Sequence, residues 1–194
     1  IGNKPTPSIG GVGLIKDYKK MITMDFKEID YLVIVIGKTE GHIDQSLFAR
    51  TILNEKNGPP PEINLFNEKN NGESLLSLIE KDYIKSAHDV SLGGILTAIS
   101  KMCIKGNKGI KLDKLKNLIS EIEYFFAEDQ GRYIVEINQK NLKEVSKILD
   151  KNSVHHEKLG VIVDKDIIIN EKTKVTIDEL KAYNNNWLIN YMNS

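Results

Sequence analysis

Residues 86–94 read Ser-Ala-His-Asp-Val-Ser-Leu-Gly-Gly, and this stretch decides the fold around it. Its first half is typical of a short strand, and its second half is typical of a paired-glycine turn that opens a helix. Asp89 or Ser91 can cap the first free amides of that helix, and Gly93 with Gly94 lets a backbone or a ligand approach closely. The apolar residues that follow recur at helical spacing: Leu92, Ile95, Leu96, Ile99, Met102 and Cys103.

The start of the predicted helix has two interpretations. A helix N-terminus carries free N–H groups and a partial positive charge, which suits an anion such as a phosphate. The same pattern also fits a capped core helix without a ligand. The neighbouring segments have to decide between the two.

Composition narrows the class of protein. The chain has 194 residues, which suits one domain, and its 27 basic side chains balance its 27 acidic ones. This balance gives no field that would attract nucleic acid or an acidic membrane surface, and no apolar run approaches the roughly 20 residues of a membrane helix. The single cysteine, Cys103, is expected to be a small buried hydrophobic residue. His155 and His156 have no third ligand at metal spacing, so we expect no metal site there.

The order of elements predicts a mixed α/β domain with one sheet covered by helices. Residues 1–20 are expected to form an extended interdomain arm, and residues 21–194 the domain itself. Strands are predicted at 31–36, 110–112 and 133–137, with a hairpin made of 159–163 and 167–169. Helices are predicted at 44–53, 73–83, 115–122 and 142–149, and after a cap at Thr176, with a rigid proline connector at 58–61.

Further segments accompany the glycine turn. Residues 5–14 read Pro-Thr-Pro-Ser-Ile-Gly-Gly-Val-Gly-Leu, and residues 125–133 read Phe-Phe-Ala-Glu-Asp-Gln-Gly-Arg-Tyr. Gly-Pro-Pro-Pro-Glu-Ile at 58–63 and Asn71-Gly72 lie between them. In this order the segments resemble the last domain of the formylglycinamide ribonucleotide amidotransferase family, within the aminoimidazole ribonucleotide synthetase superfamily. The resemblance runs from Pro5 to Trp187. Selenophosphate synthetases, hydrogenase-maturation proteins and thiamine-phosphate kinases share the glycine turn. They do not share the segments at 5–14 and 125–133 together.

The resemblance implies a function in purine biosynthesis. Enzymes of this family convert formylglycinamide ribonucleotide, ATP and ammonia to the amidine, and release ADP and phosphate. A glutaminase domain or subunit supplies the ammonia. The catalytic histidine and the magnesium-binding carboxylates lie in other domains, so we expect no catalytic residue and no metal ligand in this chain. ATP and magnesium would serve the full-length cytoplasmic enzyme, and this chain alone would hold neither.

The domain would instead form one wall of an interdomain site for a nucleotide or a phosphorylated ribonucleotide, together with upstream domains of the same polypeptide. By the pseudo-symmetry of the family's repeated architecture, this could be the nucleotide site that does not turn over. Two segments supply the candidate binding residues: His88, Asp89, Ser91, Gly93 and Gly94 in the first, and Glu128, Asp129, Gln130 and Arg132 in the second.

The second segment also has two interpretations. Carboxylates and an amide can accept hydrogen bonds from ribose hydroxyls, and an arginine can hold a phosphate bidentately. Alternatively the segment is a solvated loop with a surface ion pair. The family's usual serine is aspartate here at Asp129. Its negative charge would resist an adjacent phosphate, which favours ribose or amide contact, or a structural role.

Two other functional classes remain open at the level of sequence. The chain could be a non-catalytic assembly or ligand-binding domain, or a domain of a related small-molecule kinase. Because the chain begins at Ile1 and not at methionine, we expect a piece of a longer protein. An open reading frame that extends upstream of Ile1 would separate the enzyme domain from the first alternative, and an upstream domain with amidotransferase motifs would count against the second.

Overall fold

The computed structural model describes residues 8–113 and 119–193. The strands in this part are β1 (Leu32–Ile36), β2 (Ile84–Val90), β3 (Gly109–Leu112), β4 (Arg132–Ile137), β5 (His156–Val163), β6 (Ile167–Ile169) and β7 (Thr173–Val175). The α-helices are α1 (Leu65–Glu80), α2 (Gly94–Gly106), α3 (Glu121–Phe126), α4 (Leu142–Lys151) and α5 (Ile177–Met192). Short 3-10 turns lie at Tyr18–Lys20 and Gln139–Asn141, and a π-helical turn, η2, lies at Ala49–Leu53.

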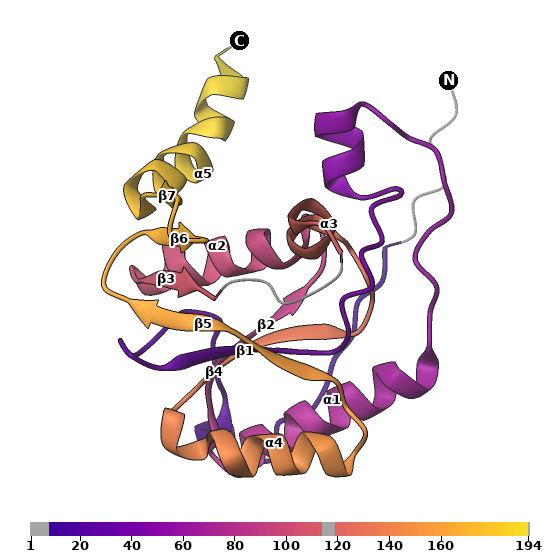
Figure 1. The fold of residues 1–194 in the computed structure, drawn as a ribbon, viewed down its shortest axis with the longest axis vertical. Helices are drawn as coiled ribbons and strands as arrows, with labels where there is room; N and C mark the ends of the chain where they lie inside the picture. The colour runs from indigo at the N-terminus through magenta and orange to yellow at the C-terminus, as the bar shows by residue number, and fades with distance from the viewer. Residues whose placement is uncertain (1–7, 114–118, 194) are drawn as a thin grey trace.

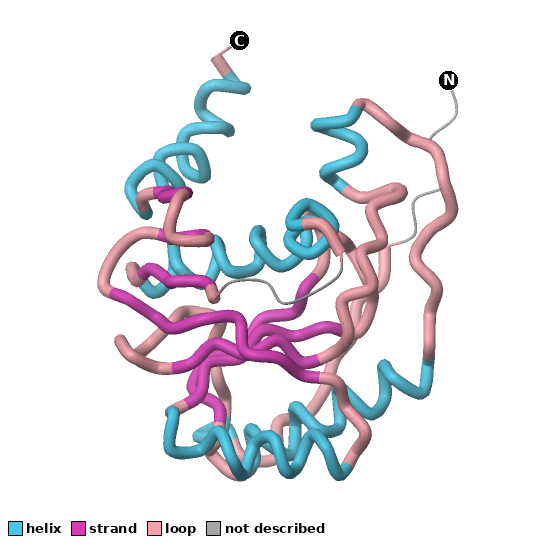
Figure 2. The backbone as a smooth tube through the Cα atoms, viewed as in Figure 1, coloured by secondary structure: helices cyan, strands magenta, loops and turns pink. Residues whose placement is uncertain are grey.

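The strands form one sheet in the order β2-β4-β1-β5-β3-β6-β7. Neighbouring strands are antiparallel except β3 and β6, which are parallel. Helices α1 and α4 cover one face, and α2 and α3 cover the other (Figures 1 and 2). The predicted mixed sheet flanked by helices is therefore confirmed.

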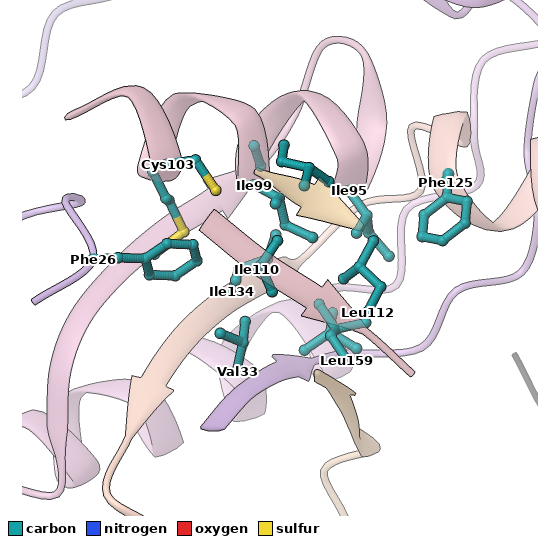
Figure 3. Close-up of a cluster of buried hydrophobic side chains, with 14 of the residues drawn as sticks. Phe26, Val33, Ile95, Ile99, Cys103, Ile110, Leu112, Phe125, Ile134 and Leu159 are labelled. Atoms are coloured by element: carbon teal, nitrogen blue, oxygen red, sulfur yellow. The ribbon is translucent and has the colours of Figure 1, made fainter. Parts of the chain in front are cut away.

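Strand β1 explains why the sheet is covered on both sides. All five of its residues are buried, and alternate side chains enter different cores. Val33 and Val35 pack with α2 and with Phe26 in the core of Figure 3, whereas Leu32, Ile34 and Ile36 pack towards α1 and α4. A continuous apolar strand is what a sheet with two covered faces requires.

Several predicted elements are confirmed within a residue or two. They include β1, β2 with α2, β3, β4 and α4, and α5 begins with a capping box of Thr176 and Glu179. Cys103 is buried as expected, and its burial raises the pKa of the thiol well above the ordinary value.

One predicted element is wrong, and two predicted helices differ from the structure in their bounds or form. The expected hairpin does not form, because β3 lies between β5 and β6, and β6 makes its hairpin with β7. Helix α1 begins at Leu65 and not at residue 73, since Asn64 accepts a hydrogen bond from the amide of Asn67 and starts the helix earlier. The expected helix 44–53 is a turn followed by η2, because Gln45 has a positive φ of 61°.

The predicted helix 115–122 falls in part outside the described residues, which omit 114–118. The helix observed in this region, α3, starts after Ser120, whose hydroxyl accepts from the Glu123 amide while the Glu123 carboxylate accepts from the Ser120 amide.

Candidate functional site

The paired glycines fit a close contact between two helices. Gly93 is the N-cap of α2 with a φ of +82°, and Gly94 follows with a φ of +69°. A Cβ atom on Gly94 would lie 2.6 Å from the carbonyl oxygen of Phe125 and 2.7 Å from that of Ala127. The first turn of α2 therefore packs directly on the backbone at the end of α3, where a side chain has no room.

The predicted side-chain cap of α2 is wrong. Neither Asp89 nor Ser91 caps the helix through its side chain. The Oδ1 atom of Asp89 lies 3.0 Å from Nδ1 of His88, and Ser91 accepts from the Gly94 amide through its backbone carbonyl. Burial raises the pKa of Asp89, but the charge and hydrogen bond of His88 outweigh it and leave the pKa lowered.

A residue outside the motif supplies the carboxylate at the helix start. The Oε1 atom of Glu128 accepts from the Gly93 amide at 2.8 Å and from the Leu47 amide at 2.7 Å. A carboxylate at this position also interacts favourably with the helix dipole. Glu128 thus joins three segments that are far apart in sequence. Within this chain, the negative charge at the glycine turn is the carboxylate of Glu128.

Asp129 organises the backbone of the loop that follows β1. Its carboxylate accepts from the amides of Glu40 at 3.0 Å, Gly41 at 3.1 Å and His42 at 3.1 Å. The side chain is buried, with 9% of its surface exposed. Serine has one hydroxyl oxygen and could not span these three amides, so the departure from the family pattern has a structural role here.

Arg132 is the largest fully buried side chain of the described residues. Its guanidinium donates to the carbonyls of Asp129 at 3.1 Å and Ala127 at 2.7 Å, and to Oγ1 of Thr39 at 3.0 Å. Burial lowers the pKa of this guanidinium, and the nearby Asp129 carboxylate opposes that shift. Arg132 therefore holds residues 127–132, the Asp129 loop, in shape from inside the protein.

A polar groove of about 950 Å³ opens beside the Asp129 loop. Its walls are Lys38 with residues 40–42, residues 61–65, one face of α1, and Asp129 with Gln130. Amide side chains are frequent among its lining residues: Asn64, Asn67, Asn71 and Gln130. The charged lining residues are Lys38, Glu40, Glu62, Glu68 and Asp129, and Lys38 pairs with Glu40 at 2.8 Å.

The chemistry of this groove favours neutral polar ligands. Amides and carboxylates can hydrogen-bond hydroxyl and amide groups, whereas an unaccompanied phosphate would meet more carboxylates than cations. No group of three or more His, Cys, Asp or Glu side chains suited to a metal ion occurs in the described part of the chain. Sequence reasoning proposed Asp129 and Gln130 as binding residues and matched residues 58–63 and Asn71 to the family. It missed the lining residues of 38–42 and the others of α1, because they carry no recognisable motif.

His88 holds an unsatisfied nitrogen. Its side chain is 9% exposed, its Nδ1 faces Asp89, and its Nε2 is buried. Among the described residues, this Nε2 atom is the one buried side-chain nitrogen or oxygen without a hydrogen-bond partner. A buried polar atom of this kind is costly to leave unpaired, so His88 is a candidate for contact with a group from outside the chain.

No helix in the described residues has the length and apolar character that a membrane span requires.

Comparison with known proteins places the fold among characterised ones. The family model described as AIR synthase related protein, C-terminal domain, matches residues 30–170. The phosphoribosylformylglycinamidine synthase subunit PurL of Pelagibacter ubique is 66% identical over 192 residues, covering 99% of this chain and 26% of that protein. The subunit of the same name from Azorhizobium caulinodans is 34% identical over 191 residues, covering 98% and 26%. The chain thus spans about a quarter of the length of these curated relatives.

Solved structures show the same fold at low identity. Thermotoga maritima PurL complexed with FGAR matches with a TM-score of 0.69 and 18% identity, over 84% of this chain and 30% of that one. The hydrogenase maturation protein HypE of Escherichia coli matches with a TM-score of 0.59 and 13% identity, over 80% and 52%. The superfamily fold expected from the glycine turn and from the segments at 5–14 and 125–133 is confirmed.

Proposed function

The chain belongs to the AIR synthase related family as one of its C-terminal domains, and on that premise we propose that it is the corresponding domain of a phosphoribosylformylglycinamidine synthase. The observation that carries this proposal is the high identity to the Pelagibacter ubique subunit along nearly the whole chain. The reaction proposed for the full-length protein is the ATP-dependent amidation of formylglycinamide ribonucleotide with glutamine-derived ammonia.

The domain contributes binding surface, and the reacting groups come from elsewhere. Glu128, Asp129 and Arg132 make their hydrogen bonds to groups of this chain, so they position the Asp129 loop. Gln130 and Asn67 of α1 are both exposed and line the groove, so they are the groups available to a ligand. We assign them the ribose or amide part of a ribonucleotide.

ATP fits this surface only in part. The balance of charges in the groove does not suit a bare triphosphate. In the full-length enzyme, ATP would supply the phosphoryl group that activates the substrate, and magnesium would neutralise its phosphates. The residues that hold both would lie in other domains of the polypeptide. His88 would meet a neighbouring group through Nε2.

The proposed partners follow from the same premise. Upstream domains of the same polypeptide would complete the ligand site, and a glutaminase domain or subunit would deliver ammonia. A solved assembly named PurLQS from Thermotoga maritima is among the structural matches, which supports such a partnership. Residues 1–20 would be the arm that connects domain 21–194 to its neighbours in the cytoplasmic enzyme.

Substitutions on two sides of α1 test the proposed surface. In the full-length enzyme, Gln130→Ala and Asn67→Ala should raise the KM for formylglycinamide ribonucleotide or ATP about 3- to 10-fold, the effect of one hydrogen bond. Asn70→Ala is the matched control, since Asn70 lines a separate depression next to α4. Steady-state kinetics measure all three variants. Unchanged KM values in both groove variants would contradict the assignment.

A further inference from the structure

The outer half of α5, residues 182–193, extends beyond the domain. Ile177 at its start is buried and Leu180 packs on the core, while Lys181 donates to Oδ1 of Asn107 at the end of α2. Every residue from Ala182 to Asn193 is exposed. Figure 1 shows the helix rising away from the sheet on the face that also carries α2 and α3.

The composition of this half does not suit a helix in water. Residues 182–193 carry no charged side chain, although charged residues make up 28% of the chain. Asn184, Asn185 and Asn186 have poor helix propensity, and no ion pair one turn apart can compensate. Three turns of such a helix are marginal without packing, so the segment requires a surface to lie against.

The side chains of one face show what kind of surface this is. Tyr183 and Trp187 lie one turn apart, 80% and 61% exposed, and Leu188 beside them is 51% exposed. The rings of Trp187 and Tyr191 are 6.4 Å apart. This face continues the line of Leu180, which already packs on the core.

The absence of charge excludes several partners. Nucleic acid and anionic membrane surfaces are bound through lysine and arginine, which residues 182–193 do not contain. Aromatic residues without charge are typical of the centre of a protein–protein interface. The occupant is therefore an apolar protein surface.

The size of the face indicates that the occupant is covalently linked. With roughly 150–250 Å² per aromatic side chain, the exposed parts of Tyr183, Trp187 and Leu188 offer about 400 Å². An independent complex needs about 800 Å² from each partner, whereas a tethered surface binds at an effective concentration in the millimolar range. Curated relatives are about four times as long as this chain, since it covers 26% of them.

We propose that the outer half of α5 docks on an apolar surface of the preceding part of the same polypeptide and thereby fastens this domain to it. The inference rests on the proposed function, because that proposal places the domain in a longer chain. Helix α5 lies beyond residue 170, where the match to the family model ends.

Hydrogen–deuterium exchange tests the docking. Amides of residues 183–192 should exchange at least about 100-fold more slowly in the full-length polypeptide than in the 194-residue chain. Tyr183→Ser with Trp187→Ser should abolish most of this difference in the full-length protein. Asn185→Ser, on the opposite face of the helix, should preserve it.

The possible outcomes separate this inference from the proposed function. If α5 exchanges equally fast in both proteins while the full-length protein forms the amidine, the docking is wrong and the function stands. If light scattering shows that the short chain is a dimer with α5 protected, a second copy is the occupant and the inference is overturned. If the full-length protein is inactive but α5 is protected there, the docking stands without the proposed function.

Discussion

The Asp129 loop and the outer half of α5 are opposite kinds of structure within one domain. In the loop, the side chains of Asp129 and Arg132 make six hydrogen bonds of 2.7–3.1 Å to other groups of this chain. The outer half of α5 instead leaves the side chains of Tyr183 and Trp187 mostly exposed, at 80% and 61%. The difference separates what the domain builds alone from what a neighbour completes.

The largest expected effect is at the glycine turn, which the Asp129 loop supports. Gly94→Val places a branched side chain against two backbone carbonyls at a positive φ. We expect a loss of about 4 kcal/mol or more in the free energy of unfolding, from strain and overpacking together. Gly72→Ala is the control, because its Cβ meets only Tyr133 Oη at 3.8 Å. Urea denaturation of both variants should separate them, and equal midpoints would contradict the role of the turn.

Removing the guanidinium beneath the loop comes next. Arg132→Ala leaves the buried Asp129 carboxylate without its cation and should cost about 3 kcal/mol or more. Lys158→Ala breaks an exposed ion pair with Asp113 and should cost less than about 1 kcal/mol. Thermal unfolding of the two variants measures this contrast. A small effect of Arg132→Ala would mean that the loop does not depend on its network.

These expectations show where the sequence was sufficient. Local patterns predicted β1, β4 and the succession from β2 to α2. A buried strand is recognised by a short continuous apolar run, and an amphipathic helix by apolar residues at helical spacing. The insertion of β3 beside β6 and the Glu128 cap on Gly93 were not predictable. Both join residues distant in sequence, and neither partner carries a local signal.

The site residues divide in the same way. The sequence identified the segment 128–132, but could not tell that Asp129 and Arg132 face inward while Gln130 faces solvent. Phosphate binding by Arg132 and its role in shaping a loop use the same donors. Only the burial of the side chain distinguishes the two.

A smaller, pH-dependent effect is expected at the buried carboxyl of Glu136. Burial raises the pKa of Glu136. Hydrogen bonds from the backbone amides of Lys27 and Glu28 and from the Ser86 hydroxyl oppose this shift without cancelling it. The folded state therefore binds the proton more tightly than the unfolded state, whose pKa is about 4.3. The stability from this group is present below that pH and is lost as the pH rises through the folded pKa. Relative to Glu136→Gln, the wild type should lose stability from pH 4 upward in denaturation curves. A gain in relative stability over that range would show that the pKa is lowered.

The smallest effect is expected in α5 of the chain by itself. Trp187→Ser should change the free energy of unfolding by less than about 0.5 kcal/mol, as for an exposed residue. Ile177→Ala, in the same helix but buried, should cost about 2 kcal/mol or more. Chemical denaturation of the 194-residue chain compares the two directly. A large cost at Trp187 would show that the outer helix already packs within the domain.

The central proposal is that this domain completes an amidating enzyme and that the reacting groups belong to the other domains. The most direct measurement is amidine formation from formylglycinamide ribonucleotide, ATP and ammonia with the preceding part of the polypeptide, with this chain, and with both together. We expect product only when both parts are present. Product from this chain alone, or full activity of the preceding part without it, would contradict the account.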